Sequence, residues 1–160
     1  MRRCAVPRVK RVLVTGMSGT GKSTLLTALA ARGYWTVDTD YGDYFETIDG
    51  ESTWIEARID ELLSIDDPRG VLFVQGTTGN QVVFYPRFDH IVLLSAPAEL
   101  IVERLRTRTT NSYGRRPADV AAILENLADV EPLLRASATL EVVTTVPVEM
   151  VVDAVLNHVS

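Results

Sequence analysis

Cysteine and long apolar runs are scarce in this sequence. Its 160 residues contain one cysteine, Cys4, which excludes an internal disulfide and favours a reducing, cytoplasmic location. No apolar run approaches the roughly 20 residues that cross a bilayer. The basic N-terminus is not followed by the apolar segment of a signal peptide, so we expect no association with a membrane.

An excess of positive charge is also missing. The 16 lysines and arginines are outnumbered by 21 acidic residues, and the net charge is -5. This balance argues against nucleic-acid binding, although it permits a local basic pocket. Neither an internal repeat nor a low-complexity linker interrupts the chain, and its length suits one core. Residues 1–160 are therefore expected to form a single domain.

Glycine, by contrast, is concentrated in an informative motif. Residues 16–23 read Gly-Met-Ser-Gly-Thr-Gly-Lys-Ser, which fits the phosphate-binding pattern G-x-x-x-x-G-K-[ST]. An apolar, β-branched run at 11–15 precedes the motif and predicts a buried strand. Residues 24–32 follow with the spacing of a helix, whose apolar face consists of Leu25, Leu26, Leu29 and Ala30. This strand–loop–helix context distinguishes a phosphate-binding loop (P-loop) from a chance match.

The chemistry of the P-loop follows from its residue types. Its glycines let backbone N–H groups turn inward around an anion, and the following helix adds its positive end. Lys22 supplies a charge for the β- and γ-phosphates, and the Ser23 hydroxyl is placed to ligate Mg²⁺. We therefore expect ATP and Mg²⁺ as cofactors, with the nucleotide bound by Gly16, Met17, Ser18, Gly19, Thr20, Gly21, Lys22, Ser23 and Thr24.

Two acids follow the next predicted strand. The run at 34–37 reads as a strand and delivers Asp38 and Asp40 at its carboxyl end. In a parallel α/β sheet this edge carries the ligand crevice, so both acids are aimed at the P-loop. One could lie near the metal and the other near a phosphate acceptor. The alternative is a helix N-cap followed by a solvated acid; the agreement of position and charge favours function.

The exit of the third predicted strand is rich in glycine and hydroxyl groups. A continuous apolar run at 71–74 predicts a buried parallel strand, followed by Gln75, Gly76 and Thr77. We expect Gly76 and Thr77 to bind a small polar substrate. Gln75 stands where motor ATPases carry an acid, which disfavours a hydrolase of that type.

Residues 42–52 look irregular, and Ser52 and Thr53 are expected to cap a helix over 54–64. Arg58 lies on that helix. It is either a ligand of a substrate anion or an exposed partner of Glu61 or Glu51.

Arginines gather around a polar loop further along the chain. Arg104, Arg106 and Arg108 precede residues 109–114, and Arg115 and Arg116 follow them. Arginine forks match phosphate oxygens, so we expect a lid at about 107–117 that closes over ATP and contributes Arg108 and Arg116. The alternative, a basic helix end favoured by the helix dipole, accounts for Arg106 more easily than for Arg116.

The remaining pattern alternates strands with helices. A short helix is expected over 80–87, a strand over 90–94 and a helix over 97–107. A helix over 118–135 with an interruption at Pro132, a strand over 139–143 and a final helix over 147–158 complete the chain. Five strand–helix repeats predict the α/β class, as a three-layer sandwich around a parallel sheet.

With these residues in place, the chain resembles the small P-loop kinases of the nucleoside-monophosphate kinase superfamily, above all the shikimate and gluconate kinase branch. The resemblance covers nearly the whole sequence. It implies a P-loop NTPase fold with strand order 2-3-1-4-5, in a monomer or small homo-oligomer. It also implies transfer of the ATP γ-phosphate to an alcohol or phosphate of a small molecule.

The same resemblance implies roles for individual residues. Asp38 matches the acid near Mg²⁺ and the acceptor hydroxyl, and Asp40 matches the acid that hydrogen-bonds the acceptor. Arg58 falls near the position that holds the substrate carboxylate in shikimate kinases. The implied nucleotide contacts are an adenine-stacking Arg104, a phosphate-binding lid Arg116 and an adenine-pocket Pro147.

Two departures from that branch bear on the acceptor. Residues 76–79 read Gly-Thr-Thr-Gly where shikimate kinases have three glycines. Residues 130–134 read Val-Glu-Pro-Leu-Leu where those kinases have an R-N-P-L-Y-like stretch, so an acid replaces a cation that binds substrate. Both changes argue against shikimate as the acceptor.

The leading hypothesis is an ATP-dependent small-molecule kinase with Lys22, Asp38 and Arg116 as catalytic residues. The sequence leaves open whether Asp38 or Asp40 takes the acceptor's proton. The alternative is an ATP-binding regulatory module or weak ATPase. A GTPase switch is disfavoured because N-K-x-D is absent and the D-x-x-G at 67–70 precedes the strand it should follow.

Overall fold

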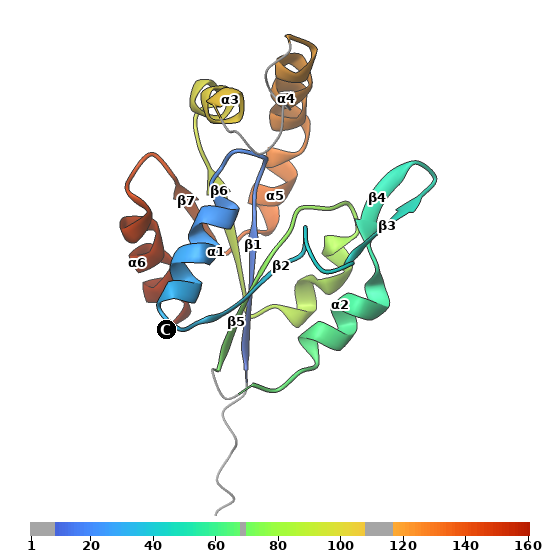
Figure 1. The fold of residues 1–160 in the computed structure, drawn as a ribbon, viewed down its shortest axis with the longest axis vertical. Helices are drawn as coiled ribbons and strands as arrows, with labels where there is room; N and C mark the ends of the chain where they lie inside the picture. The colour runs from blue at the N-terminus through green and yellow to red at the C-terminus, as the bar shows by residue number, and fades with distance from the viewer. Residues whose placement is uncertain (1–8, 68–69, 108–116) are drawn as a thin grey trace, which may run out of the picture.

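The computed structural model describes residues 9–67, 70–107 and 117–160. Its centre is a five-stranded sheet in which every pairing is parallel. The strands are β1 (Lys10–Thr15), β2 (Trp35–Asp38), β5 (Val71–Gln75), β6 (His90–Ser95) and β7 (Leu140–Val143). They lie side by side in the order β2-β5-β1-β6-β7 (Figure 1). Numbered within this sheet alone, that order is the predicted 2-3-1-4-5.

Helices cover both faces of the sheet, as the three-layer prediction requires. The helices α1 (Lys22–Ala31) and α6 (Val148–Val159) pack on one face, and α2 (Glu56–Leu63) and the 3-10 helix η1 (Gln81–Arg87) on the other. Alternate residues of β1 face opposite layers: Val12 and Val14 join the first core, and Leu13 joins the second. This alternation follows from the two-residue period of a strand.

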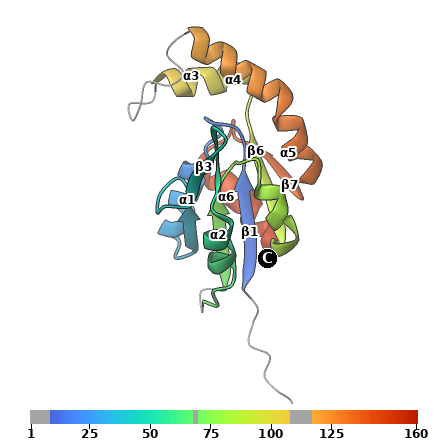
Figure 2. The same cartoon turned by 90° about the vertical axis from the view of Figure 1, so that its right-hand side faces the viewer.

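A separate group of helices lies beyond the carboxyl end of the sheet. The helices α3 (Ala98–Thr107) and α4 (Pro117–Asp129) cross over the end of β1 in Figure 2, and α5 (Glu131–Ser137) leads back toward β7. Buried side chains of α3 and α4 form a small core of their own. The predicted break at Pro132 falls at Val130, because a proline is accommodated in the first turn of a new helix.

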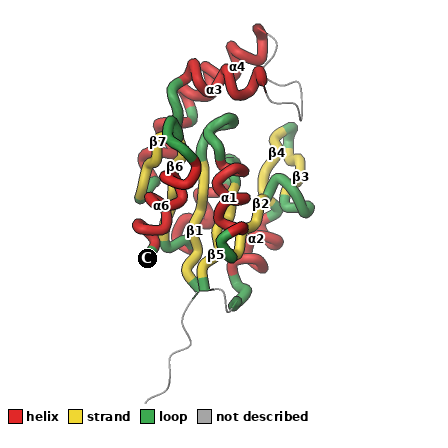
Figure 3. Tube along the Cα trace, turned by 60° about the vertical axis from the view of Figure 1, so that its left-hand side comes forward, coloured by secondary structure: helices red, strands yellow, loops and turns green. Residues whose placement is uncertain are grey.

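The prediction for residues 42–64 was wrong in its first half. A hairpin of β3 (Phe45–Ile48) and β4 (Glu51–Trp54) stands apart from the main sheet, as the yellow strands of Figure 3 show. Its two turn residues, Asp49 and Gly50, have φ of 52° and 80°. Asp-Gly is a favoured pair for such a turn, so the signal was present in the sequence. Ser52 and Thr53 therefore belong to β4 and do not cap α2.

Among the described residues, none of the helices combines the length and the apolar character that crossing a bilayer requires.

Candidate functional site

The P-loop connects the end of β1 to the start of α1, as predicted. Its first glycine, Gly16, fits only because it lacks a side chain: an added Cβ would lie 2.4 Å from the Leu94 carbonyl oxygen of β6. The loop is therefore pressed against the sheet. Gly21 has a left-handed backbone, and it stands at the N-cap of α1.

Lys22 bends back over the loop. Its ammonium group donates to the carbonyl oxygens of Gly16, at 2.7 Å, and Met17, at 3.0 Å. Burial lowers the pKa of Lys22 to about 8, and the charges of Asp40 and Asp38 oppose the shift. Lys22 is thus charged at neutral pH, but it is much easier to deprotonate than an exposed lysine.

The two aspartates lie beside the P-loop serine. The Ser23 hydroxyl, in the first turn of α1, donates at 3.0 Å to Oδ2 of Asp38, the last residue of β2. The backbone N–H of Asp40 donates to Asp38 Oδ1, also at 3.0 Å. Asp38 is half-buried and Asp40 is exposed. The structure therefore brings Ser23 and Asp38, the two predicted metal ligands, into contact.

Gln75 completes this cluster, and its contact with the aspartates was not predicted from the sequence. The side chain is 1% exposed. Its amide nitrogen donates to Asp38 Oδ1 at 2.6 Å and to Asp40 Oδ2 at 3.3 Å. A single amide thus bridges the carboxylates of both aspartates.

Mg²⁺ commonly binds one or two carboxylates and completes its shell with nucleotide phosphates and water. The contact between Ser23 and Asp38 fits that requirement. Across the described segments, no cluster of three or more histidine, cysteine, aspartate and glutamate side chains is arranged to hold a metal by itself. A metal at this site would therefore need the phosphates as additional ligands.

Gly76 and Thr77, predicted to bind substrate, are both engaged inside the protein. The Gly76 N–H donates to the Val14 carbonyl at 3.1 Å, and an added Cβ would lie 2.5 Å from Trp54 Cζ2. The Thr77 hydroxyl donates to the Gly16 carbonyl at 2.7 Å and accepts from the Gly16 N–H at 3.2 Å. Both residues therefore support the base of the P-loop.

Arg58 projects from the exposed side of α2. Its guanidinium donates to the Gly42 carbonyl at 3.2 Å and lies 5.7 Å from the centre of the Tyr44 ring. The chain that links β2 to the hairpin therefore supplies its partners. A substrate anion would have to compete with these contacts.

Arg104 joins α3 to the P-loop and to the segment that follows β7. Its guanidinium donates to the Gly19 carbonyl and to the Thr144 hydroxyl, both at 3.0 Å, and also to the Thr144 carbonyl. The buried Thr144 hydroxyl in turn donates to the Thr20 carbonyl at 2.8 Å. Thr144 was missed from the sequence, although a hydroxyl residue just after a strand's carboxyl end is a usable signal.

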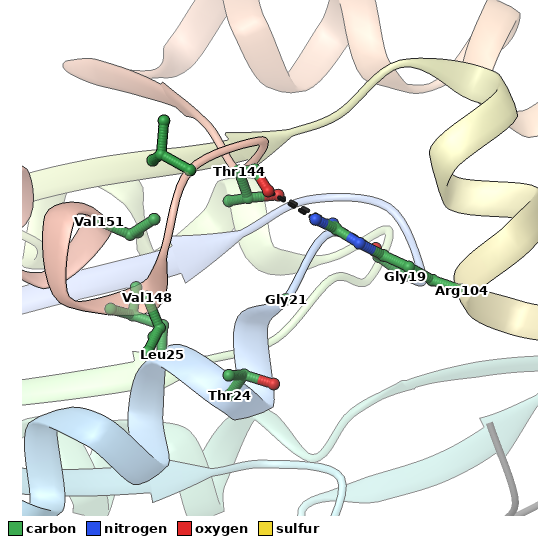
Figure 4. A pocket seen from close by; sticks show the side chains of 9 residues that line it. Gly19, Gly21, Thr24, Leu25, Arg104, Thr144, Val148 and Val151 are labelled. Carbon is green, nitrogen blue, oxygen red and sulfur yellow. Dashed lines mark hydrogen bonds between the residues drawn. The ribbon is translucent and has the colours of Figure 1, made fainter. Parts of the chain in front are cut away.

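Beside this clamp lies a cavity of about 420 Å³. Figure 4 shows Arg104 reaching Thr144 on one side and the apolar side chains of Leu25, Val148 and Val151 on the other. Pro147, predicted to line an adenine pocket, is the exposed N-cap residue of α6. Its neighbours Val146 and Val148, rather than Pro147, line the cavity.

The predicted lid is only partly described. Arg106 is exposed in the last turn of α3. Arg108, Arg115 and Arg116 lie outside the described residues, and their roles remain predictions.

A family model described as an AAA domain matches residues 12–126. The chain belongs to this family. No curated protein matches it with significance.

Solved structures are similar over nearly the full length. A shikimate kinase from Acinetobacter baumannii in complex with shikimate is 17% identical, with a TM-score of 0.65, over 95% of this chain and 96% of that one. A shikimate kinase from Bacteroides thetaiotaomicron is 19% identical, with a TM-score of 0.60, over 93% and 97%. A gluconokinase from Sinorhizobium meliloti 1021 is 20% identical, with a TM-score of 0.61, over 96% and 91%. At these identities the likeness establishes the fold of a small P-loop kinase and leaves the substrate open.

Proposed function

We propose that this protein is an ATP-dependent phosphotransferase that moves the γ-phosphate to a hydroxyl or phosphate of a small molecule. The observation that carries the proposal is the contact between Ser23 and Asp38, with Asp40 alongside. It puts the metal-binding hydroxyl of a P-loop and two potential acceptor-orienting carboxylates within one cluster. A module that only bound Mg²⁺-ATP would need the loop and the carboxylate beside Ser23, but not a second carboxylate next to them.

The cavity beside Arg104 suits a nucleotide base. Its walls combine the apolar side chains of Leu25, Val148 and Val151 with the edge of the P-loop at Gly19 and Gly21. A base held there would extend its phosphates along the loop toward Lys22 and Ser23. Apolar walls with a few polar groups are typical of cofactor sites.

The chain's own residues account for the transfer step. Lys22 leaves the Gly16 and Met17 carbonyls to bind phosphate oxygens, and Arg116 approaches from the lid. The acceptor oxygen forms a bond to the γ-phosphorus as the bond from that phosphorus to the β–γ bridging oxygen breaks, which releases ADP. Asp38 or Asp40 orients the acceptor hydroxyl and receives its proton. Mg²⁺, held by Ser23, Asp38 and the phosphates, would neutralise phosphate charge.

The hairpin side of the protein favours an acceptor without negative charge. A cavity of about 540 Å³ lies between the hairpin, the start of α2 and Asn80. The carboxylates that line it belong to Glu46, Asp49, Glu51 and Glu56. Carboxylates repel a sugar acid or nucleotide acceptor. If the acceptor binds in this cavity, which none of the predicted substrate residues lines, a neutral or amino-bearing polyol is favoured.

ADP release from Mg²⁺-ATP tests the proposal directly. Neutral polyols, aminated sugars, sugar acids and nucleosides are supplied in turn, with Lys22→Ala as the inactive control. Acceptor-dependent ADP release that Lys22→Ala abolishes is the expected result. Release at the same slow rate with every acceptor, in a protein that binds ATP by calorimetry, would contradict the proposal.

Slow ADP release that is the same with every acceptor would favour an ATP-binding regulatory module or weak ATPase. One observation supports this candidate: a neutral Gln75 stands at the end of β5, where hydrolysing ATPases of the motor type carry an acid. The module predicts that replacing Asp40 changes neither ATP binding nor the slow ADP release, whereas the phosphotransferase loses its acceptor-dependent release.

A further inference from the structure

Gln75 lies at the centre of the candidate site, in contact with both aspartates. It ends β5, and in the sheet register it stands opposite Val14 of β1 and Asp38 of β2. Its side chain is buried, and it is directed at two carboxylates and away from the apolar core. Burying an unpaired polar group is costly, so the two hydrogen bonds to the aspartates explain how the amide of Gln75 can be buried here.

The chemistry of the partners fixes the direction of the amide. Ionised carboxylates accept hydrogen bonds and donate none, so the nitrogen of the amide, with its two N–H groups, must face Asp38 and Asp40. The bonds of 2.6 Å and 3.3 Å use both N–H groups. The amide therefore holds two negative groups beside each other without adding charge.

This bridge occupies one oxygen of each aspartate and leaves the other oxygen of each outside it. Asp38 Oδ1 accepts from the Gln75 amide and from the Asp40 N–H, which leaves Oδ2 turned toward the Ser23 hydroxyl. Asp40 uses Oδ2 for the bridge. Its Oδ1 receives no hydrogen bond from the part of the chain that the structure describes. Asp38 thus presents an oxygen to the P-loop, and Asp40 has one that no described residue occupies.

We propose that Gln75 is a positioning residue that divides the work of the two aspartates, with Asp38 on the metal side and Asp40 on the acceptor side. This inference rests on the proposed phosphotransferase function. It also explains the amide in place of an acid: a glutamate there would lack the two donors and would add a third negative charge to the cluster. Gln75 acts through the aspartates and does not itself touch the reacting groups.

The backbone of Gln75 supports the same turn independently of its side chain. Its carbonyl accepts from the N–H of Thr39 at 3.2 Å and from the Thr39 hydroxyl at 2.7 Å. Thr39 lies between the two aspartates and also accepts a hydrogen bond from the Trp54 indole at 3.0 Å. Replacing the amide therefore leaves the turn anchored, so a side-chain variant reports on the bridge rather than on the fold.

The test measures how ADP binding depends on Mg²⁺, which requires neither an acceptor nor transfer. ADP is titrated calorimetrically into the protein at a series of MgCl₂ concentrations, and the half-saturating Mg²⁺ concentration is extracted. Gln75→Met keeps the length of the side chain and removes both donors. We expect it to raise the half-saturating Mg²⁺ concentration by about 10-fold or more, the usual effect of losing a partner that orients a metal ligand.

A matched control is available at Gln81, the first residue of η1. Gln81 is also buried, at 2% exposed, and its amide bonds Thr15 and Tyr85 rather than an aspartate. Gln81→Met should lower thermal stability much as Gln75→Met does, without moving the Mg²⁺ dependence. Gln75→Asn, which keeps an amide but shortens its reach, is a second test of the bridge and should shift the dependence in the same direction.

The different roles proposed for Asp38 and Asp40 are tested by replacing each aspartate separately. Asp38→Asn should raise the Mg²⁺ requirement for ADP binding, whereas Asp40→Asn should leave it within about twofold of the wild type and should impair only acceptor-dependent transfer. Folded Gln75→Met and Gln75→Asn proteins with a wild-type Mg²⁺ dependence would overturn the inference. If the Mg²⁺ shifts occur but no acceptor supports transfer, the phosphotransferase proposal fails and the role of Gln75 toward the metal survives.

Discussion

Nucleotide binding should weaken as pH rises above 8, because Lys22 loses its proton in the free protein before it does so in the complex. Burial lowers the pKa of this lysine to about 8, with the charges of Asp40 and Asp38 acting in the opposite direction. Bound phosphates add negative charge beside the ammonium group and favour its protonated form. Binding at alkaline pH must therefore be accompanied by the uptake of a proton.

The size of the effect follows from that pKa. With a free-state value of about 8, the protonated fraction of Lys22 falls from roughly nine-tenths at pH 7 to about one-tenth at pH 9. If only the protonated form binds phosphate well, the affinity for ADP falls about 10-fold over that interval, or about 1.4 kcal/mol. Above pH 8 the slope approaches one decade per pH unit, until the pKa of the complex is reached.

Calorimetry in buffers of different ionisation enthalpy measures both the affinity and the number of protons taken up. Lys22→Arg is the matched control, since a guanidinium stays protonated throughout this range. Its affinity, whatever its absolute value, should not change between pH 7 and pH 9. A wild-type affinity that is equally flat, with no proton uptake at pH 9, would refute the assignment of a lowered pKa to Lys22.

The stability of the free protein should respond to pH in the opposite sense. The pKa of Lys22 is lowered in the folded state, so between about pH 8 and its unfolded value of 10.5 the unfolded chain binds more protons. This group therefore makes folding more favourable as pH rises through that window, while ADP binding becomes weaker.

Three further predictions concern the groups around the site. Thr144→Val removes the hydroxyl that joins Arg104 to Thr20, so it should lower the free energy of unfolding by about 1–3 kcal/mol and weaken ADP binding. The control is Thr107→Val, which removes an exposed hydroxyl on α3. An unchanged ADP affinity in Thr144→Val would contradict a role for the contacts between Arg104 and Thr144. Gly76→Ala forces a methyl group into Trp54 and should cost about 1–3 kcal/mol in chemical denaturation, with a change in tryptophan fluorescence; wild-type stability would show that the indole yields freely. Arg116→Ala should lower kcat far more than ATP affinity, with the exposed Arg106→Ala as control; equal losses in both quantities would argue against a closing lid.

The sequence was most informative where structure is encoded locally. The P-loop pattern together with its flanking strand and helix placed residues 11–31 correctly, because glycine spacing and apolar periodicity act over a few neighbouring residues. The strand order followed from the family resemblance rather than from any local pattern. The hairpin at 45–54 was missed although Asp49-Gly50 marks its turn, since its strands carry many polar residues and lack clear alternation.

Contacts between distant segments were the part that the sequence could not provide. Nothing local indicates that the amide of Gln75 reaches two aspartates more than 30 residues earlier. The same holds for Thr144, whose partners lie on α3 and in the P-loop. Such contacts depend on the sheet order, which sets Asp38 beside Gln75 in register and brings the end of β7 toward the cavity beside Arg104.

Once the internal hydrogen bonds are assigned, the polar groups of the site fall into two classes. In the first class, the hydroxyl groups donate to backbone carbonyls of neighbouring segments and so hold the site in shape; these are Thr39, Thr77 and Thr144. Lys22 holds carbonyls that a phosphate can replace, and Asp40 Oδ1 accepts no hydrogen bond from the described residues. The chemistry must fall to the second class, because only groups whose partners can be exchanged gain from binding a ligand. Residue type alone does not separate the two classes, because all five residues are polar.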